Sequence, residues 1–252
     1  MKTVSCFISN RNHGKYVRAA VDSVMSQTVP PTEVILINDG SQDKTAEVFE
    51  RCAAMYPEVR VITHQTPQGH INGYNEGILR SHGDYLHLMS ADDVLNDSTF
   101  YERGIKALET ACLFSGGLQW MDSEGMLMPQ KAIPPFNGEV SAELCLRAMN
   151  QFGNFICGAA TLVRGDLQRK HLYDGSYPFT ADAINWARIL CHNIPAAFTT
   201  DVVFLYRRHQ AQMTSHSSGP EEERKRMREE LEACSRYASH VKRSLPQRGS
   251  SS

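Results

Sequence analysis

Three features that mark membrane or secreted proteins are missing from this sequence. No apolar run reaches the roughly 20 residues that a membrane-spanning helix requires. Residues 1–9 carry one charged side chain and too short an apolar stretch for a signal peptide. The seven cysteines form no C-x-x-C pair, and their odd number argues against a disulfide framework or a zinc site. These absences predict a cytoplasmic protein whose thiols are reduced.

A marked excess of one charge sign is also missing. The 28 acidic and 26 basic residues leave a formal net charge of −2, which gives no drive toward nucleic acid or an anionic membrane. We therefore predict no nucleic-acid partner. With 252 residues, of which 41% are hydrophobic, the chain can bury a sizeable core in one large domain or two small ones.

Glycine-rich phosphate-binding loops are absent after the first predicted strand. Neither G-x-x-x-x-G-K-[ST] nor G-x-G-x-x-G occurs there, which argues against a P-loop kinase and a dinucleotide-dependent dehydrogenase. A nucleotidyltransferase would need a Gly-rich signature bearing Arg or Lys at the same place, and residues 9–15 contain one glycine. That class stays the weaker alternative.

The first half of the sequence contains a regular alternation of short apolar runs and helical patterns. Strand, helix and strand in repeated order predict a mostly parallel α/β sheet with helices on both faces. The predicted strands span 3–8, 33–38, 59–63 and 85–91, and the predicted helices span 15–27, 45–56 and 72–81.

Each of these strands is followed by a polar loop. Right-handed crossovers bring the carboxyl ends of parallel strands to one edge of the sheet, where open α/β sheets bind ligands. We therefore expect Asn10, Asp39, Gly69 and the Asp92–Asp93 pair to be neighbours in space.

The second half is less regular. A Gly-Gly pair indicates a bent strand, a D-S-E-G sequence indicates a hairpin turn, and a Pro-Pro pair indicates a loop that could act as a flap. The predicted helices are 97–110, 141–150 and 180–191; the predicted strands are 112–120, 156–163 and 197–206, the last a bent strand or a strand pair; the turn is 122–125 and the loop 130–138.

A charged helix is predicted after residue 219, with disorder over residues 247–252. A narrow apolar stripe runs along this helix. It favours packing on the same chain or on a sister chain, as a homodimer, over peripheral contact with a membrane. The stripe consists of Met227, Leu231, Cys234, Ala238 and Val241.

Two adjacent carboxylates, Asp92 and Asp93, end the apolar run that begins at Tyr85. Holding two such charges together is costly unless a cation shares them. A divalent ion whose shell a phosphorylated ligand completes is the simplest partner. The alternative is that both acids merely cap the segment that follows.

Three further side chains are candidates for chemistry. Asp39 can accept hydrogen bonds from a base or a ribose, or simply initiate a turn. Asp182 can act as a general base, although an acid at a helix start is normally stabilised by the helix dipole, which weakens it as a base. His209 can ligate a metal or contact a diphosphate, or belong to a basic loop with Arg207 and Arg208.

Several of these segments, in this order, resemble a family 2 glycosyltransferase of GT-A fold. Asp182 and Arg188 keep the spacing of the family's acid and arginine helix, and residues 206–209 resemble its closing strand. The resemblance covers about residues 3–215 and rests on segments 8–17, 21–28, 33–45, 69–78 and 83–93.

The resemblance implies an inverting transfer of a sugar from a nucleoside diphosphate sugar to a hydroxyl of a glycan or glycolipid acceptor, in polysaccharide or glycolipid assembly. It divides the chain into a donor-binding half (1–110), an acceptor-binding half of the same domain (111–215) and a helical tail (216–252). The residues it implies are Asp182 as base; Ser9, Asn10, Arg11, Asp39, Gly69, Asn75 and Asp92 for the donor; and Asp93, Asp92 and His209 for Mn²⁺ or Mg²⁺.

The sequence departs from the family's pattern at several of these motifs. Residues 9–11 replace the usual Pro-Thr-Tyr, Tyr74 stands in the place of an arginine, and Ser90 replaces the first acid of an Asp-x-Asp motif. Residues 207–209 are candidates for the missing positive charge. A catalytically inactive module that still binds a nucleotide sugar is therefore the main alternative.

Overall fold

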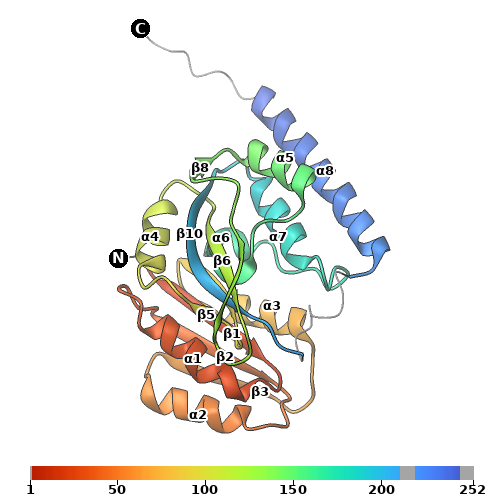
Figure 1. The fold of residues 1–252 in the computed structure, drawn as a ribbon. Coiled ribbons are helices and arrows are strands. Elements are labelled where there is room, and N and C mark those ends of the chain that lie inside the picture. Colours follow the sequence, from red (N-terminus) through yellow and green to blue (C-terminus); the bar gives the residue numbers. More distant parts are fainter. Residues whose placement is uncertain (1, 211–218, 245–252) are drawn as a thin grey trace.

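One mixed sheet organises the chain, with helices on both of its faces (Figure 1). The computed structural model describes residues 2–210 and 219–244. The strand order is β3-β2-β1-β4-β9-β6-β10-β5, and β7 pairs with β6 while β8 pairs with β10. The strands are β1 (Val4–Asn10), β2 (Glu33–Asp39), β3 (Val59–His64), β4 (Tyr85–Ser90), β5 (Val94–Leu95), β6 (Leu113–Met121), β7 (Leu127–Ala132), β8 (Gly138–Val140), β9 (Thr161–Arg164) and β10 (Ala196–Arg207).

The helices pack in two layers on either side of this sheet. The helices α1, α2 and α4 share one apolar core with the sheet, and α3, α5, α7 and α8 share the other. Their bounds are α1 (Gly14–Met25), α2 (Thr45–Met55), α3 (His70–Arg80), α4 (Phe100–Ala107), α5 (Ala142–Phe152), α6 (Gly165–Gln168), α7 (Ala181–Leu190) and α8 (Glu221–Ser244), with a 3₁₀ turn η1 (Gly158–Ala160).

The two cores follow from the alternation of side chains along the central strands. In β1, Cys6 and Ile8 contribute to the core beneath α1, whereas Phe7 contributes to the core beneath α3. Strands β1, β2, β3 and β4 are parallel, so their carboxyl ends lie at one edge. The predicted mixed, mostly parallel sheet with helices on both faces is confirmed.

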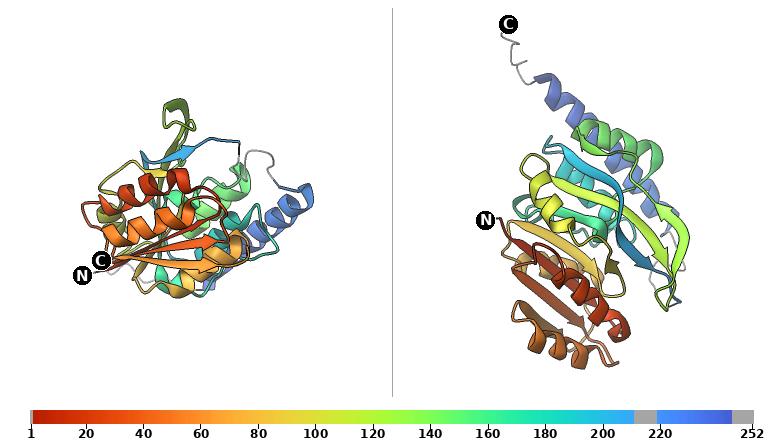
Figure 2. Two further views of the ribbon diagram at one scale, coloured as in Figure 1. Left: turned by 90° about the horizontal axis from the view of Figure 1, so that it is seen from below. Right: turned by 60° about the vertical axis from the view of Figure 1, so that its left-hand side comes forward.

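Two predictions for the second half need correction, and one pair of alternatives is resolved. Residues 156–163 are not one strand, because η1 interrupts the run before β9 begins at Thr161. The predicted loop 130–138 is in part strand β7, which extends the hairpin with β6 that projects from the sheet in Figure 2. The alternatives for 197–206 resolve to one strand, β10, whose register with β6 shifts between Phe198 and Phe204.

The C-terminal helix α8 lies beside α5 and α7 (Figures 1 and 2). Leu231 and Ala238 of its apolar stripe are buried there, and Met227 and Cys234 pack against the same core. The stripe therefore packs on its own chain, which is the first of the two favoured readings of the sequence. The side chain of Val241 and the expected disorder of residues 247–252 lie outside the described part.

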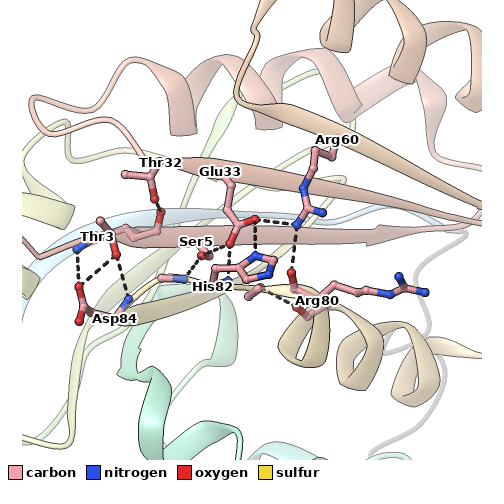
Figure 3. Close-up of polar contacts among 12 residues, drawn as sticks. Thr3, Ser5, Thr32, Glu33, Arg60, Arg80, His82 and Asp84 are labelled. Carbon is pink, nitrogen blue, oxygen red and sulfur yellow. Dashed lines mark hydrogen bonds and ion pairs between the residues drawn. The ribbon is translucent and has the colours of Figure 1, made fainter.

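A polar network fastens the opposite edge of the parallel strands (Figure 3). The Glu33 carboxylate, at the start of β2, accepts hydrogen bonds from the Ser5 hydroxyl (2.5 Å) and the His82 N–H (2.5 Å), and it pairs with the Arg60 guanidinium at 2.6 Å. One side chain thus joins β1, β2, β3 and the turn before β4. Burial alone would raise the pKa of Glu33, but these donors lower it below its usual range.

We expect Glu33→Gln to reduce the free energy of unfolding at pH 7 by about 1–3 kcal/mol, since it weakens three charge-assisted contacts. A carboxylate with a lowered native pKa stabilises the fold above its unfolded pKa of about 4.3, and this contribution is lost as the pH falls through the native pKa. Urea unfolding at several pH values should therefore show the difference shrinking below pH 4. The exposed Glu50→Gln change is the control, and a difference independent of pH would contradict this account.

Candidate active site

The acidic turn after β4 is held between two strands. Val94 and Leu95 of β5 pair antiparallel with β10, which brings the end of β10 against Asp92 and Asp93. The Arg207 N–H donates to Asp93 Oδ1 at 2.7 Å, and the Arg207 Nε donates to the main-chain oxygen of Asp92 at 2.7 Å. These contacts fix the directions of the two acids.

Asp92 belongs to a cluster of three potential metal ligands. Its Oδ2 lies 2.9 Å from His209 Nε2 and 3.9 Å from His13 Nδ1, and the three ligand atoms lie within 4.8 Å of one another. The two imidazole rings meet edge to face at 5.1 Å. The ring of Tyr16, over which the Arg207 guanidinium lies at 4.6 Å, packs on His209 at 5.3 Å.

Asp93 differs from Asp92 in its burial and in its contacts. It is only 1% exposed, against 8% for Asp92, and it is not a member of the ligand cluster. Burial, followed by the charge of Asp92, raises the pKa of Asp93 well above its usual range, although Arg207 opposes this rise. The sequence placed Asp93 first among the metal ligands, whereas the structure directs Asp92 toward His209. His13 was not predicted as a ligand, because a single histidine in a loop has no ligand spacing of its own.

The cluster's donor set fits a divalent transition metal. Two imidazole nitrogens and one carboxylate oxygen suit ions that accept both nitrogen and oxygen, whereas Mg²⁺ prefers oxygen ligands in a strict octahedron. Of the two ions that the resemblance implies, Mn²⁺ therefore matches His13, Asp92 and His209 better.

Two of the expected donor-binding residues lie at the same edge of the sheet. Asp39, at the end of β2, accepts the N–H groups of Gln68 (2.7 Å) and Gly69 (2.9 Å) and contacts His64 at 3.1 Å. Burial would raise the pKa of Asp39, but these three partners lower it. Its carboxylate orders the loop that leads into α3.

Asn10 ends β1 and is buried. Its amide nitrogen donates to the Thr45 hydroxyl at 3.1 Å, while its Oδ1 has no partner within the described part of the chain. A buried acceptor left unpaired is costly, so Asn10 Oδ1 is a suitable acceptor for an N–H or hydroxyl of a bound ligand.

The remaining expected donor-binding residues differ in their surroundings. Ser9 packs directly against Gly73 of α3, where a side chain would collide with its hydroxyl. Arg11 is exposed. Asn75 donates to the Tyr173 carbonyl (2.9 Å) and accepts its N–H (2.8 Å), so its amide joins α3 to the loop before α7.

Asp182 lies in the first turn of α7. Its Oδ2 accepts the Gly158 N–H of η1 at 3.1 Å. Burial raises the pKa of Asp182, and Gly158 and the Tyr173 hydroxyl only partly oppose this rise. The sequence suggested that the helix dipole would make this acid a weaker base, but desolvation outweighs the dipole here.

Two side chains, Tyr74 and Cys157, sense the charges of both Asp182 and the acidic turn. Burial raises the pKa of Tyr74, and the charges of Asp182 and then Asp92 raise it further. Burial, followed by the charges of Asp182 and then Asp93, likewise raises the pKa of Cys157 to about 12. Both side chains therefore feel the acid of α7 and the acids after β4, so one polar region contains both groups.

Comparison with protein families identifies the family of this chain. The family model described as Glycosyl transferase family 2 matches residues 5–170, which is more than half of the chain. The chain belongs to glycosyltransferase family 2. The matched segment of this glycosyltransferase includes the acidic turn but ends before Asp182. The family match therefore does not cover α7, and a role for α7 rests on the structure alone.

Most curated relatives of this family 2 glycosyltransferase match it over less than half of their own length. An uncharacterized glycosyltransferase of Nostoc is 31% identical over 36% of the chain and 28% of its own length. One of Haemophilus influenzae is 24% identical over 84% of the chain and 67% of its own length. The poly-beta-1,6-N-acetyl-D-glucosamine synthase of Staphylococcus epidermidis is 31% identical over 39% of the chain and 24% of its own length.

Solved structures show the same GT-A fold. S. aureus TarS in complex with UDP-GlcNAc has a TM-score of 0.68 at 17% identity, covering 85% of this chain and 61% of that chain. The mannosyltransferase PcManGT of Pyrobaculum calidifontis, in complex with GDP-Man and Mn²⁺, has a TM-score of 0.61 at 12% identity, covering 99% and 76%. Within residues 2–210 and 219–244, no helix of this glycosyltransferase has the length and apolar character needed to cross a membrane.

Proposed function

We propose that the chain transfers a sugar, with inversion, from a nucleoside diphosphate sugar to an acceptor hydroxyl. The observation that carries this proposal is the His13–Asp92–His209 ligand cluster beside the acidic turn, with a tyrosine, Tyr74, that senses the charges of both Asp182 and Asp92. TarS with UDP-GlcNAc and PcManGT with GDP-Man and Mn²⁺ support a donor of this class. The likeness to a polysaccharide synthase supports a glycan or glycolipid acceptor.

The donor's diphosphate would lie at the ligand cluster. His13, Asp92 and His209 would hold the metal, and a bound divalent cation would neutralise charge that develops on the leaving diphosphate. Asn10 Oδ1, which has no partner in the described part, would accept a hydrogen bond from the base or ribose. Arg207, which contacts the acidic turn, would keep Asp92 directed toward the metal.

Asp182 would act on the other substrate. Its carboxylate would accept the acceptor's hydroxyl proton while the acceptor oxygen forms a bond to the anomeric carbon. The bond from that carbon to the diphosphate breaks, and the diphosphate leaves with the electron pair. Because the diphosphate needs no proton to leave, one base suffices, unlike the two carboxylates of a glycosidase. A raised pKa makes Asp182 a stronger base than an ordinary aspartate.

A calorimetric titration with UDP- and GDP-sugars, with and without Mn²⁺, tests this proposal. We expect one donor to bind in a metal-dependent manner and to release its nucleoside diphosphate slowly, with water as the acceptor. Binding without any release, across many offered acceptors, would favour the inactive module. Absence of binding by the folded protein in Mn²⁺ would contradict both readings.

The choice of metal should depend on the two histidines. We expect the selected donor to bind at least about tenfold more tightly with Mn²⁺ than with Mg²⁺, because imidazole ligands favour the transition metal. In His13→Ala the preference for Mn²⁺ over Mg²⁺ should shrink, since one of the two nitrogen ligands is removed and the Asp92 oxygen becomes a larger share of the ligand set. His192→Ala, which changes an exposed histidine elsewhere, is the matched control. Equal affinity with both ions in the unaltered protein would contradict this assignment of ligands.

A further inference from the structure

The start of α7 is not capped by its own side chains. Thr180 is the N-cap residue, but its hydroxyl makes no capping hydrogen bond to the helix. Helix N-termini expose several N–H groups, and leaving them unsatisfied in a buried place is costly. Asp182 lies two residues farther on, so whatever satisfies this end also fixes the direction of the proposed base.

Glu223 of α8 instead holds the two residues that lead into α7. One of its oxygens, Oε1, accepts the N–H of Phe179 (2.8 Å), the N–H of Thr180 (2.8 Å) and the Thr180 hydroxyl (2.9 Å). Glu223 is 3% exposed, although it stands in a run of charged residues. A buried carboxylate with three donors at a helix start is stabilised by hydrogen bonds and by the helix dipole.

Helix α8 is itself fixed to the segment before α7. Glu230 pairs with Arg188 of α7 at 2.6 Å and accepts the Tyr177 hydroxyl at 3.0 Å. Arg226 donates to the Ser176 carbonyl at 3.0 Å. Together with Glu223, these contacts attach the segment that enters α7 at three successive places along α8.

We propose that Glu223 is a positioning residue that holds the start of α7, and with it Asp182, in the orientation needed for transfer. The proposal rests on the proposed function, because it takes Asp182 as the base. It assigns the C-terminal helix a part in the reaction, although the helix touches neither the acidic turn nor the ligand cluster through any contact described above. Glu223 lies beyond the family match of residues 5–170.

Two variants of Glu223 test the proposal. Glu223→Ala removes the acceptor, and we expect kcat for donor breakdown, with water as acceptor, to fall at least about tenfold, since a small displacement of a catalytic group costs rate. The donor affinity measured in Mn²⁺ should stay unchanged, because the ligand cluster is built from other elements. Glu223→Gln retains an oxygen that can accept the same N–H groups and should restore most of kcat.

The control variant is Glu222→Ala, which removes an exposed carboxylate one residue away on the same helix. All variants are compared well below their unfolding midpoints, so a loss of folded protein does not contribute. A second readout needs no turnover: the titration of the Asp182 carboxyl group, followed by carbon-13 NMR and assigned with Asp182→Asn. We expect its midpoint to fall in Glu223→Ala, where the carboxyl becomes better solvated, and to stay near the unaltered value in Glu222→Ala.

The outcomes separate this proposal from the proposed function. A protein without donor breakdown overturns the transfer reaction, and the Asp182 titration then decides alone whether Glu223 positions that residue. An active protein in which Glu223→Ala keeps both its kcat and the Asp182 titration midpoint would overturn the positioning role. A change in donor affinity that equals the change in kcat would also overturn it, because it would show a general loss of structure.

Discussion

Asp182→Asn is expected to lower kcat by about 10²–10⁴-fold, which is the usual contribution of a general base. The donor's affinity in Mn²⁺ should remain within about twofold of its unaltered value, because Asp182 is not a member of the ligand cluster. Rates of nucleoside diphosphate release and calorimetric dissociation constants, measured on the same preparations, provide the two numbers.

The fold should tolerate this substitution. An asparagine oxygen can still accept the Gly158 N–H that now binds Asp182 Oδ2. Because the native pKa of Asp182 is raised, its contribution to stability is fully present below the unfolded pKa and is lost as the pH rises through the native pKa. Above its native pKa the ionised group therefore opposes folding, and in that pH range Asp182→Asn should slightly increase the free energy of unfolding.

The pH profile gives a second check on Asp182. A base must be deprotonated to act, so kcat should fall as the pH decreases through the native pKa of Asp182, which lies above the ordinary value of 3.8. The residual activity of Asp182→Asn should lack this limb. Asp166→Asn, which changes a partly exposed acid on α6, is the control. A variant that keeps its kcat would remove Asp182 from the reaction.

The parallel half of the sheet could be predicted from the sequence because three of its four strands, β1, β2 and β4, are buried on both faces. Residues 34–37, for example, are apolar throughout, and such a run is typical of a strand that is covered on both faces. The hairpin strand β7 was missed for the opposite reason. Most of its residues are exposed, so they show no alternation that the sequence could reveal.

The interrupted run 156–163 shows a different limit. Gly158, Ala159 and Ala160 are small and apolar, as in a buried strand, yet they form a 3₁₀ turn. A contact with Asp182, 24 residues away, favours the turn. A local sequence pattern cannot show a contact between residues so far apart, which is why the second half of the chain was harder to predict than the first.

The candidate site was predictable to the extent that sheet topology determines it. Asp92 and His209 come together because β5 pairs with the end of β10. His13 joins them because its loop follows β1, and sequence spacing could not show this. Glu223 is likewise indistinguishable within a run of charged residues until the packing of α8 is known.

The two adjacent acids should differ widely in their response to the same substitution. Asp92→Asn replaces a carboxylate ligand of the cluster with a neutral amide, and we expect metal-dependent donor affinity to fall by at least about 100-fold, above the range for residues that only orient ligands. Asp93→Asn should reduce that affinity by less than about tenfold. Titrations of the selected donor at several Mn²⁺ concentrations distinguish a lost metal site from a lost donor contact.

The reason lies in what each acid contacts. Asp93 Oδ1 accepts the Arg207 N–H at 2.7 Å, and an asparagine oxygen can replace it there, whereas Asp92 Oδ2 faces His209 and His13. Asp93→Asn also removes a buried charge repelled by its neighbour, so its free energy of unfolding without metal should be unchanged or higher. Asp201→Asn, on the exposed side of β10, controls for the loss of one negative charge. If instead Asp93→Asn abolishes the effect of Mn²⁺ while Asp92→Asn preserves it, the order of the ligands is the one that the family resemblance implied, and the His13–Asp92–His209 cluster is an internal polar contact of the fold.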